Sequence, residues 1–304
     1  MLSIQRVLVP VDFSSHADQA VADAIEIARA FDAHIDLLHV WHLPIQASMP
    51  QAGLVPVEVM EGFRKGEHER LKVIEAGVRS EKVPCASHMI EGVPSQQIAN
   101  SAEELGSDLI VMGTRGRTGL QHVLLGSVAE RVVRSARCPV LTAKADDTRG
   151  AIRPRVIVVP IDFSGAAERA LQAARDLAGA MGPAHLVLVH GYYVPAELEQ
   201  MLVSESTGGS GGVLDRLSKD AARELEQMLV SLQDAGVSAE YVAQHGPPER
   251  VIARVAEERD ADLIVMGTHG RKGLSRLLIG SVAEHIVRVA PCPVLTIRPE
   301  EEAD

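Results

Sequence analysis

Short apolar runs alternate with longer amphipathic stretches along the whole chain. In the first half, β-branched runs predict strands at Val7–Val11 and Ile35–Trp41, and the Ala-rich stretch Ala17–Ala30 between them predicts a helix with Ser14 as its N-cap. The same pattern predicts further helices at Val57–Val78, Pro94–Leu105 and Gly126–Arg137, and further strands at Lys82–Ile90, Asp108–Met112 and Pro139–Ala143. Strands that alternate with helices favour a parallel, doubly wound α/β sheet.

The second half repeats this order from Val156 to Ile297. The clearest repeat is Asp108–Thr142, which matches Asp262–Thr296 without gaps at 25 of 35 positions by direct count. The sequence therefore predicts two tandem Rossmann-like domains, each with a five-stranded parallel sheet in the order 3-2-1-4-5 flanked by helices. We expect domains at residues 1–146 and 152–304, joined through the short polar segment Lys144–Gly150.

One Gly/Ser-rich segment, Ser204–Gly212, follows the second predicted strand of the second half. Its composition predicts a flexible surface loop, and the alternative is a lid near a binding site.

Composition narrows the function classes. A chain of 304 residues with 46% hydrophobic and 23% charged residues can bury two cores. The net charge of -11 disfavours general affinity for nucleic acid or anionic membrane. Cys85, Cys138 and Cys292 form neither a disulfide framework nor a zinc spacing. The N-terminal segment has no signal-peptide layout and no run is long enough to span a membrane, so we expect a cytoplasmic protein.

Each half carries the same glycine spacing after its fourth predicted strand, in a loop that leads into a helix. The spacing is Gly113-x2-Gly116-x9-Gly126-Ser127 in the first half and Gly267-x2-Gly270-x9-Gly280-Ser281 in the second. Glycine lets the backbone approach an anion closely, and a helix start offers unpaired N–H groups and the positive end of the dipole. The repeated motif therefore predicts a phosphate site, and the alternative is that these glycines only form turns. It matches neither the P-loop nor the dinucleotide fingerprint, which disfavours NAD and FAD.

Polar side chains within these loops support the phosphate interpretation. The hydroxyls of Ser127 and Ser281 can cap the following helix or bond a phosphate oxygen. Basic residues between the glycines would offset phosphate charge: Arg115, Arg117, His269, Arg271 and Lys272.

Asp12 and Asp162 end the first predicted strand of each half. At the switch point between the first and fourth strands, each carboxylate is expected to face its glycine loop, where it can accept hydrogen bonds from a ribose or hold Mg²⁺ bound to phosphates. The alternative is helix capping within the Asp-Phe-Ser turn. His39 and His190 end the second strands, where a buried histidine with one hydrogen bond is expected and a catalytic role is the alternative.

Together these features resemble the tandem, ATP-binding branch of the universal stress protein family over nearly the whole chain. The resemblance rests on Val-Pro-Val-Asp-Phe-Ser at Asp12, Val-Pro-Ile-Asp-Phe-Ser at Asp162, both glycine motifs, and the terminal Cys-Pro-Val-Leu strands at Cys138 and Cys292. It implies a stress-response regulator that binds ATP or AMP in both domains, with cyclic AMP as a further alternative. The implied nucleotide contacts are Asp12, Val40, Gly113, Gly116, Gly126, Ser127 and Val128 in the first domain, and Asp162, Gly267, Gly270, Gly280, Ser281 and Val282 in the second.

The resemblance also implies differences and partners. His190-Gly191 stands where the first half has His39-Val40, so we expect two unequal adenine pockets. The family's dimer contact through the last strand would join the two halves as a pseudo-dimer, with Ala143 and Ile297 on the pairing edges, and a further homodimer stays open. Two other functions stay open as well: a slow ATPase or nucleotidyl/phosphoryl-transfer enzyme that uses Asp12, Asp162 and Mg²⁺, and a non-catalytic scaffold.

Overall fold

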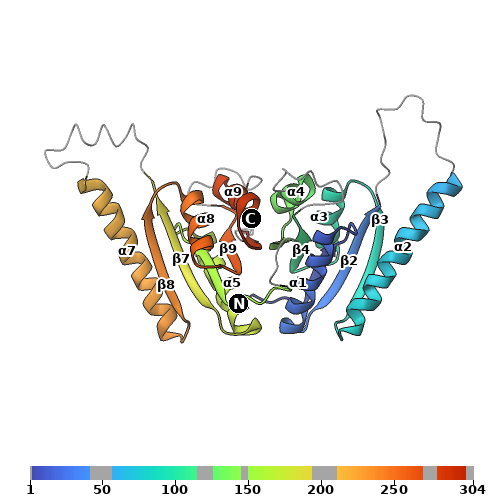
Figure 1. The fold of residues 1–304 in the computed structure, drawn as a ribbon, viewed down its shortest axis with the longest axis horizontal. Helices are drawn as coiled ribbons and strands as arrows, with labels where there is room; N and C mark the ends of the chain where they lie inside the picture. Colours follow the sequence, from blue (N-terminus) through green and yellow to red (C-terminus); the bar gives the residue numbers. More distant parts are fainter. Residues whose placement is uncertain are drawn as a thin grey trace, which may run out of the picture. The chain divides into compact units, whose positions relative to one another are not determined.

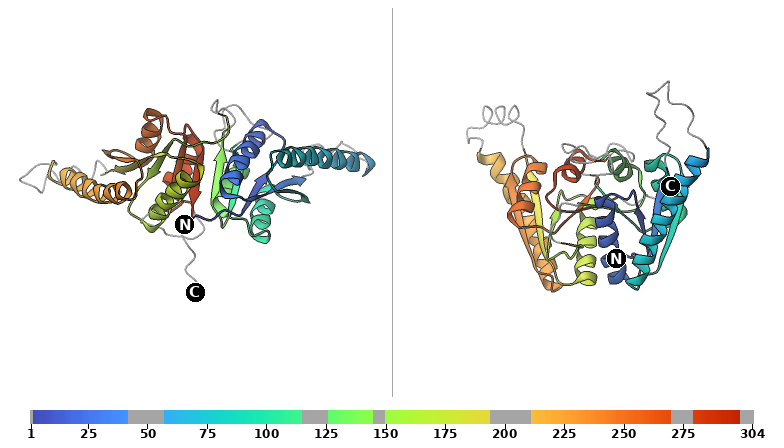
Figure 2. Two further views of the ribbon diagram at one scale, coloured as in Figure 1. Left: turned by 90° about the horizontal axis from the view of Figure 1, so that it is seen from below. Right: turned by 45° about the vertical axis from the view of Figure 1, so that its right-hand side comes forward.

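The computed structural model describes residues 2–41, 57–114, 126–144, 150–193, 211–269 and 279–298 (Figure 1). Each half of the chain forms an open parallel sheet with helices on both faces (Figure 2). The fold class predicted from the sequence is thereby confirmed.

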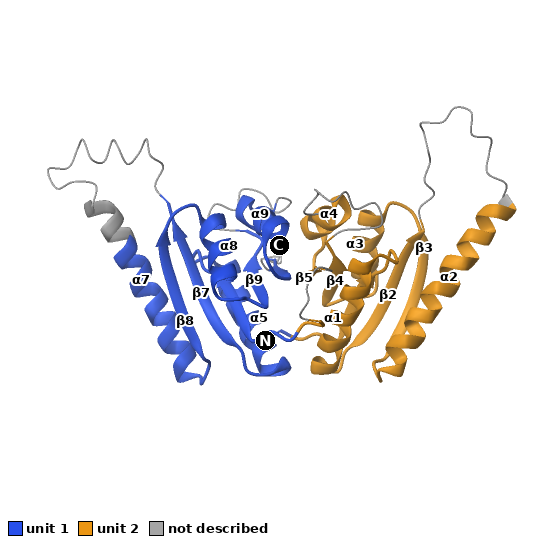
Figure 3. Ribbon diagram, in the orientation of Figure 1, with its two compact units in different colours: residues 1–2, 153–304 blue, residues 3–152 orange. Residues whose placement is uncertain are grey.

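The chain divides into two compact units (Figure 3). We call Ser3–Ile152 domain 1; domain 2 comprises Arg153–Asp304 together with Met1–Leu2.

In domain 1, strands and helices alternate strictly. They are β1 (Arg6–Pro10), α1 (Ser15–Phe31), β2 (His34–Trp41), α2 (Val57–Ser80), β3 (Cys85–Glu91), α3 (Pro94–Glu104), β4 (Leu109–Gly113), α4 (Ser127–Ser135) and β5 (Val140–Ala143). The strands lie in the order β3-β2-β1-β4-β5, and each pair is parallel. This is the predicted order 3-2-1-4-5.

Domain 2 repeats the arrangement. Its elements are β6 (Val156–Pro160), α5 (Gly165–Met181), β7 (His185–Tyr192), α7 (Gly211–Asp234), β8 (Ala239–His245), α8 (Pro248–Glu258), β9 (Leu263–Gly267), α9 (Ser281–Val289) and β10 (Val294–Ile297). The strand order is β8-β7-β6-β9-β10, again parallel.

The central strands are buried on both faces, as a parallel sheet covered by helices requires. Val7, Leu8 and Val9 of β1 have no exposed surface, and α1 buries Ala20 and Ala24 completely. Small residues on the inner face of the helix let it lie close to the sheet, which explains how so few aromatic residues suffice for the core.

Most predicted boundaries hold within two residues, and one does not. The Ser14 hydroxyl accepts a hydrogen bond from the Ala17 N–H at 3.3 Å, which confirms the predicted N-cap. The third strand was predicted from Lys82 but begins at Cys85. Lys82 has a φ of 63°, a left-handed turn conformation that no strand continues through.

The Gly/Ser-rich segment predicted as a loop lies outside the described residues as far as Ser210. Its last two residues, Gly211 and Gly212, belong instead to helix α7.

Two hydrogen bonds show how the segments before β1 and β6 are held. The Ile152 N–H donates to Asp23 Oδ1 at 2.9 Å within domain 1. The Leu2 N–H donates to Asp176 Oδ2 within domain 2. Helix α1 therefore holds the segment before β6 through Asp23, and helix α5 holds the segment before β1 through Asp176.

Candidate functional site

The Asp-Phe-Ser turn after the first strand has the same geometry in both domains. Asp12 Oδ1 accepts hydrogen bonds from the Ser14 N–H at 3.1 Å and from the Ser14 hydroxyl at 2.6 Å. Asp162 and Ser164 repeat both contacts at 3.1 Å and 2.5 Å. The capping role weighed against ligand binding is thus present, because the aspartate orients the serine that caps the helix.

A cavity of about 240 Å³ lies at the carboxyl end of the domain 2 sheet. Four of the residues predicted to bind nucleotide in this domain line it: Asp162, Gly267, Gly280 and Val282. Gly191 lines it too, whereas Ser281 is exposed and does not. Residues from the ends of three strands and the start of α9 therefore meet around one hollow, as expected at a switch point.

In domain 1 the corresponding predicted residues occupy the corresponding positions. Asp12 follows β1, Val40 lies near the end of β2 and Gly113 ends β4, while Gly126, Ser127 and Val128 begin or precede α4. The structure thus brings these residues to the carboxyl end of one sheet, and their role in binding stays a prediction.

Helices α4 and α9 start without a side-chain cap. Their N-caps are Gly126 and Gly280, which make no side-chain hydrogen bond, and Ser127 and Ser281 are the first helical residues. Capping by these two serines is therefore not observed. The Gly280 N–H donates to the Thr268 carbonyl at 2.7 Å, which fixes the start of α9 beside the end of β9.

Gly113 and Gly267 have a packing reason to be glycine. A Cβ on Gly113 would lie 2.7 Å from His16 Cβ, and a Cβ on Gly267 would lie 2.8 Å from Ala166 Cβ. The missing side chain gives room to the first turn of α1 or α5. This packing is enough to explain why both positions are glycine, without a close approach of the backbone to an anion.

Several predicted residues lie outside the described parts of the chain. They are Gly116 and Gly270, with the basic residues Arg115, Arg117, Arg271 and Lys272. His269 is described: its Nδ1 lies 2.9 Å from the Thr268 hydroxyl, and its ring lines the cavity. Its Nε2 is buried and has no hydrogen-bond partner among the described residues.

The two strand-end histidines differ. His190 Nδ1 contacts the Ile161 carbonyl at 2.6 Å, but the residue is half-buried, so the expected burial is not observed. His39 Nδ1 contacts the Val11 carbonyl at 2.7 Å, and its Nε2 also lies 3.1 Å from Glu67 Oε2. The prediction of a single hydrogen bond is therefore wrong for His39.

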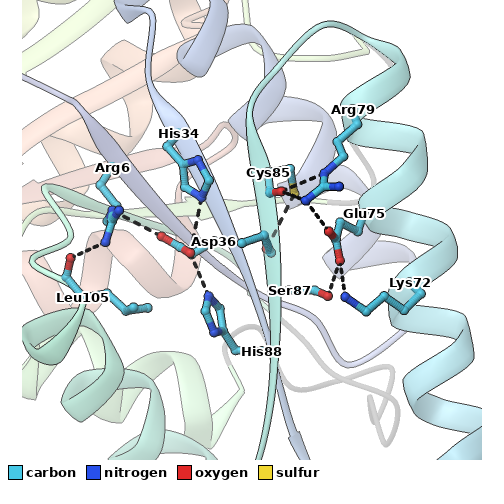
Figure 4. Close-up of polar contacts among 11 residues, drawn as sticks. Arg6, His34, Asp36, Lys72, Glu75, Arg79, Cys85, Ser87, His88 and Leu105 are labelled. Carbon is cyan, nitrogen blue, oxygen red and sulfur yellow. Dashed lines mark hydrogen bonds and ion pairs between the residues drawn. The ribbon is translucent and has the colours of Figure 1, made fainter.

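Domain 1 carries a polar cluster around Asp36 that spans β1, β2 and β3 (Figure 4). The carboxylate of Asp36 accepts from His88 Nε2 at 2.8 Å and lies 3.4 Å from Arg6 Nε and 3.5 Å from His34 Nε2. Asp36 lies near the start of β2, away from Val40 at the strand's other end. The cluster therefore joins β1, β2 and β3 and lies away from the sheet edge where Asp12, Val40 and Gly113 are found.

A second cluster in Figure 4 ties α2 to β3. Glu75 accepts from Lys72 Nζ at 2.8 Å and from the Ser87 hydroxyl, and it pairs with Arg79 Nη2 at 2.7 Å. The hydrogen bonds from Lys72 and Ser87 lower the pKa of Glu75 below its ordinary value. Nearby, burial raises the pKa of the Cys85 thiol to about 12, so this thiol stays protonated and unreactive at neutral pH.

Sequence reasoning missed the apolar wall of the cavity. Ala167 from α5, Pro248 and Ile252 from α8, and Ala283 from α9 belong to this wall. A Cβ on Gly191 would lie 2.7 Å from Pro248 Cα, so this helix and strand approach closely. The sequence did contain a signal for this wall. The pattern Gly-x-Pro occurs in both domains, at Gly92 and at Gly246, and the proline of the second pattern is Pro248 of the wall.

The described residues contain no helix long and apolar enough to cross a membrane. Among the same residues, no group of three or more His, Cys, Asp or Glu side chains has the arrangement of a metal site.

Comparison with known proteins identifies the family. The profile of the Universal stress protein family matches residues 3–144 and again residues 154–298. A universal stress protein of Methanocaldococcus jannaschii is 38% identical over 140 residues, which cover 46% of this chain and 82% of that protein. A universal stress protein of Mycolicibacterium smegmatis is 27% identical over 309 residues, covering 96% and 97%. The crystal structure of a universal stress protein from Archaeoglobus fulgidus covers 100% of both chains with a TM-score of 0.75 at 22% identity, which supports the fold. The chain therefore belongs to the universal stress protein family and carries the family's domain twice.

Proposed function

We propose that each domain binds an adenine nucleotide at the carboxyl end of its sheet, and that occupancy regulates the protein's action in a stress response. The observation that carries the proposal is the domain 2 cavity, which gathers Asp162, Gly267, Gly280 and Val282 beside the uncapped start of α9. An uncapped helix start attracts phosphate through its N–H groups and its dipole.

The size of the cavity indicates how a nucleotide would lie. Its volume of about 240 Å³ is below the roughly 300–1,000 Å³ typical of ligand sites. We therefore place the nucleoside inside, between Gly191 and Ile252, and the phosphates at the rim near Gly280. Asp162 would accept hydrogen bonds from the ribose. The aspartates supply at most one carboxylate per domain, so Mg²⁺ would be held mainly by phosphate oxygens and water.

The two sites are expected to have unequal affinities. In domain 2, Gly191 lets Pro248 approach the strand end, and Pro248 forms part of the cavity wall. In domain 1, Val40 adds a β-branched side chain at the corresponding place. A difference in this wall changes the contact with the base, so ATP, AMP and cyclic AMP should rank differently at the two sites.

A charge placed in the cavity wall tests the proposal. Val282→Asp puts a carboxylate beside the predicted phosphate position, where it repels the nucleotide. The fold should persist, because an acidic residue in the first turn of α9 stabilises the helix. We expect calorimetric titration with ATP or AMP to lose the domain 2 site in this variant, by more than about tenfold in affinity. Mass spectrometry of the denatured wild-type protein should reveal co-purified adenine nucleotide.

The matched control is Val230→Asp, the same substitution at a half-exposed position on α7. It should bind as the wild type does. Equal binding by Val282→Asp and Val230→Asp would overturn the assignment of the domain 2 site. Absence of binding by the wild type at millimolar nucleotide, with none co-purified, would leave the scaffold alternative.

Two further assays address the remaining alternatives. Phosphate release that falls in Asp12→Ala with Asp162→Ala would favour a slow ATPase or transferase, and equal release would reject it.

We also propose that the last strands pair the domains as a pseudo-dimer at Ala143 and Ile297. Sedimentation of the whole chain then distinguishes a monomer from a further homodimer.

A further inference from the structure

Helix α2 carries large apolar side chains on the side that faces solvent. Among the described residues, Val59, Phe63 and Val73 have 46%, 68% and 71% of their surface exposed. Their spacing places all three on one side of the helix, whereas Leu71 and Val78 on the other side are buried. Figure 1 shows α2 alongside β3, the edge strand of the domain 1 sheet. Exposed apolar side chains gathered on one face are typical of a surface that another molecule covers.

Three glycines lie on the same side of α2. An added Cβ on Gly62, Gly66 or Gly77 would meet no described atom within 4 Å, so packing within the described part of domain 1 does not require glycine there. Inside a helix, glycine is less favourable than alanine. Glycine on an exposed side lets the backbone of a second helix approach closely, because no Cβ intervenes. We use the name α2 face for the residues on this side: Val59, Gly62, Phe63, Gly66, Val73, Ala76 and Gly77.

The same side of α7 is largely polar. Both helices have 24 residues, and Leu71 and Leu225 are fully buried at the same position of each. This register identifies the α7 residues that stand in the places of Gly66, Val73 and Gly77. They are Asp220, Gln227 and Ser231, and all three are exposed. The apolar face is therefore a property of α2 and not of the fold that the two domains share.

The α2 face is complementary to itself when two copies of the helix run antiparallel. With the two-fold axis next to Gly66, Val59 of one copy lies opposite Gly77 of the other, and Val73 lies opposite Gly62. Each of these valines then meets a glycine, and each contact occurs twice because the interface is isologous. The two copies of Gly66 lie near the crossing point, where the helix axes are closest.

Charges beside the α2 face select the same antiparallel arrangement. Lys65 of one copy lies opposite Glu69 of the other, again twice by symmetry, and both residues are exposed. Glu58 in the first turn then lies beside the last turn, which holds Arg79, and the two helix dipoles oppose each other favourably. In a parallel pair each charge would instead lie level with the same charge of the other copy. Charge complementarity of this kind sets orientation and partner choice more than affinity.

We propose that the α2 face is a docking surface for a second copy of this chain, and that two chains associate through an antiparallel, two-fold pair of α2 helices. The proposal depends neither on nucleotide binding nor on the pairing of the two domains within a chain. A pair of 24-residue helices is about 36 Å long and makes a small interface. The dimer should therefore dissociate on dilution to micromolar concentrations.

Sedimentation of the full chain between about 1 µM and 300 µM tests the docking surface. The wild type should change from monomer to dimer over this range. Phe63→Glu should raise the dissociation constant at least about tenfold, because it replaces an apolar side chain of the interface by a charge. The domain should still fold, because this side chain is exposed and glutamate favours a helix.

The matched control is Val230→Glu, at a half-exposed apolar position of α7. Its dissociation constant should equal that of the wild type. A wild type that stays monomeric over the whole range would overturn the proposal. So would a dimer that Phe63→Glu leaves unchanged, or that Val230→Glu weakens to the same extent.

Charge reversal tests the antiparallel register. Lys65→Glu and Glu69→Lys each place like charges opposite one another twice, so each variant alone should associate about fivefold or more weakly at low salt. A mixture of the two variants restores opposite charges at both places and should form a mixed dimer about as stable as that of the wild type. A mixture that associates no better than either variant alone would overturn the antiparallel pairing of α2 with itself.

Discussion

Single residues at the turns decide how each domain is built. Ser14 both caps α1 and donates to Asp12, so one hydroxyl organises the helix start and the carboxylate beside it. Its equivalent Ser164 does the same with Ala167 and Asp162. The sequence Asp-Phe-Ser is thus a structural unit as well as a candidate binding element.

Ser14→Ala removes this cap. We expect the free energy of unfolding of domain 1 to fall by about 1 kcal/mol, because a helix N–H loses its partner. Urea unfolding of the full chain measures it. Ser15→Ala, at the exposed first position of α1, is the control and should have little effect; equal losses in both variants would contradict the capping role.

Acid should weaken the second polar cluster of domain 1. The pKa of Glu75 is lowered in the folded protein, so its contribution is complete above the ordinary glutamate pKa and is lost as pH falls through the lowered value. The difference in unfolding free energy between wild type and Glu75→Gln should therefore shrink between neutral pH and about pH 3. Exposed Glu69→Gln should show no such pH dependence. A constant difference for Glu75→Gln would contradict the contribution of its ionised form.

At the level of elements, the contact between a strand end and the following helix fixes the edge where the candidate site lies. Gly113 at the end of β4 meets His16 in the first turn of α1. This packing sets the distance between β4 and the Asp12 turn.

Gly113→Ala should disturb this contact. Its Cβ would lie within 2.7 Å of His16 Cβ and 2.8 Å of the His16 main chain, so domain 1 should lose about 1–3 kcal/mol. Gly77→Ala, on α2 where nothing lies within 4 Å, should instead add about 0.5–1 kcal/mol. Chemical unfolding measures the change in unfolding free energy for both variants. An unchanged unfolding free energy in Gly113→Ala would contradict the packing constraint, because helix α1 would then move to accommodate the Cβ.

Sequence pattern was sufficient for the elements and their order. Apolar runs and their spacing predicted the strands, because burial on both faces leaves a strong signal. The alternation of strands and helices predicted a doubly wound sheet, whose Rossmann-like order begins 3-2-1-4-5. The start of β3 was missed because the left-handed conformation of Lys82 has no signature in a lysine. The Glu67–His39 contact was also missed, because residues 28 positions apart meet only after α2 has packed on β2.

At the level of the whole molecule, duplication predicts two independent nucleotide sites in one chain. The wild type should bind two nucleotides per chain by calorimetry, with unequal affinities. Val282→Asp and Val128→Asp should each reduce the number to one, and together to none, because each places a carboxylate near one predicted phosphate position. Loss of both sites in either single variant would contradict two separate sites.

The hydrogen bonds of Leu2 and Ile152 also bear on how the chain can be divided. A cut after Ile152 keeps this residue, which donates to Asp23, in the first fragment. The same cut leaves Leu2 on a different fragment from its acceptor Asp176. A cut at residue 146 separates both donors from their aspartates. No single cut therefore yields two complete halves, and two fragments mixed in solution would have complementary ends with which to re-associate.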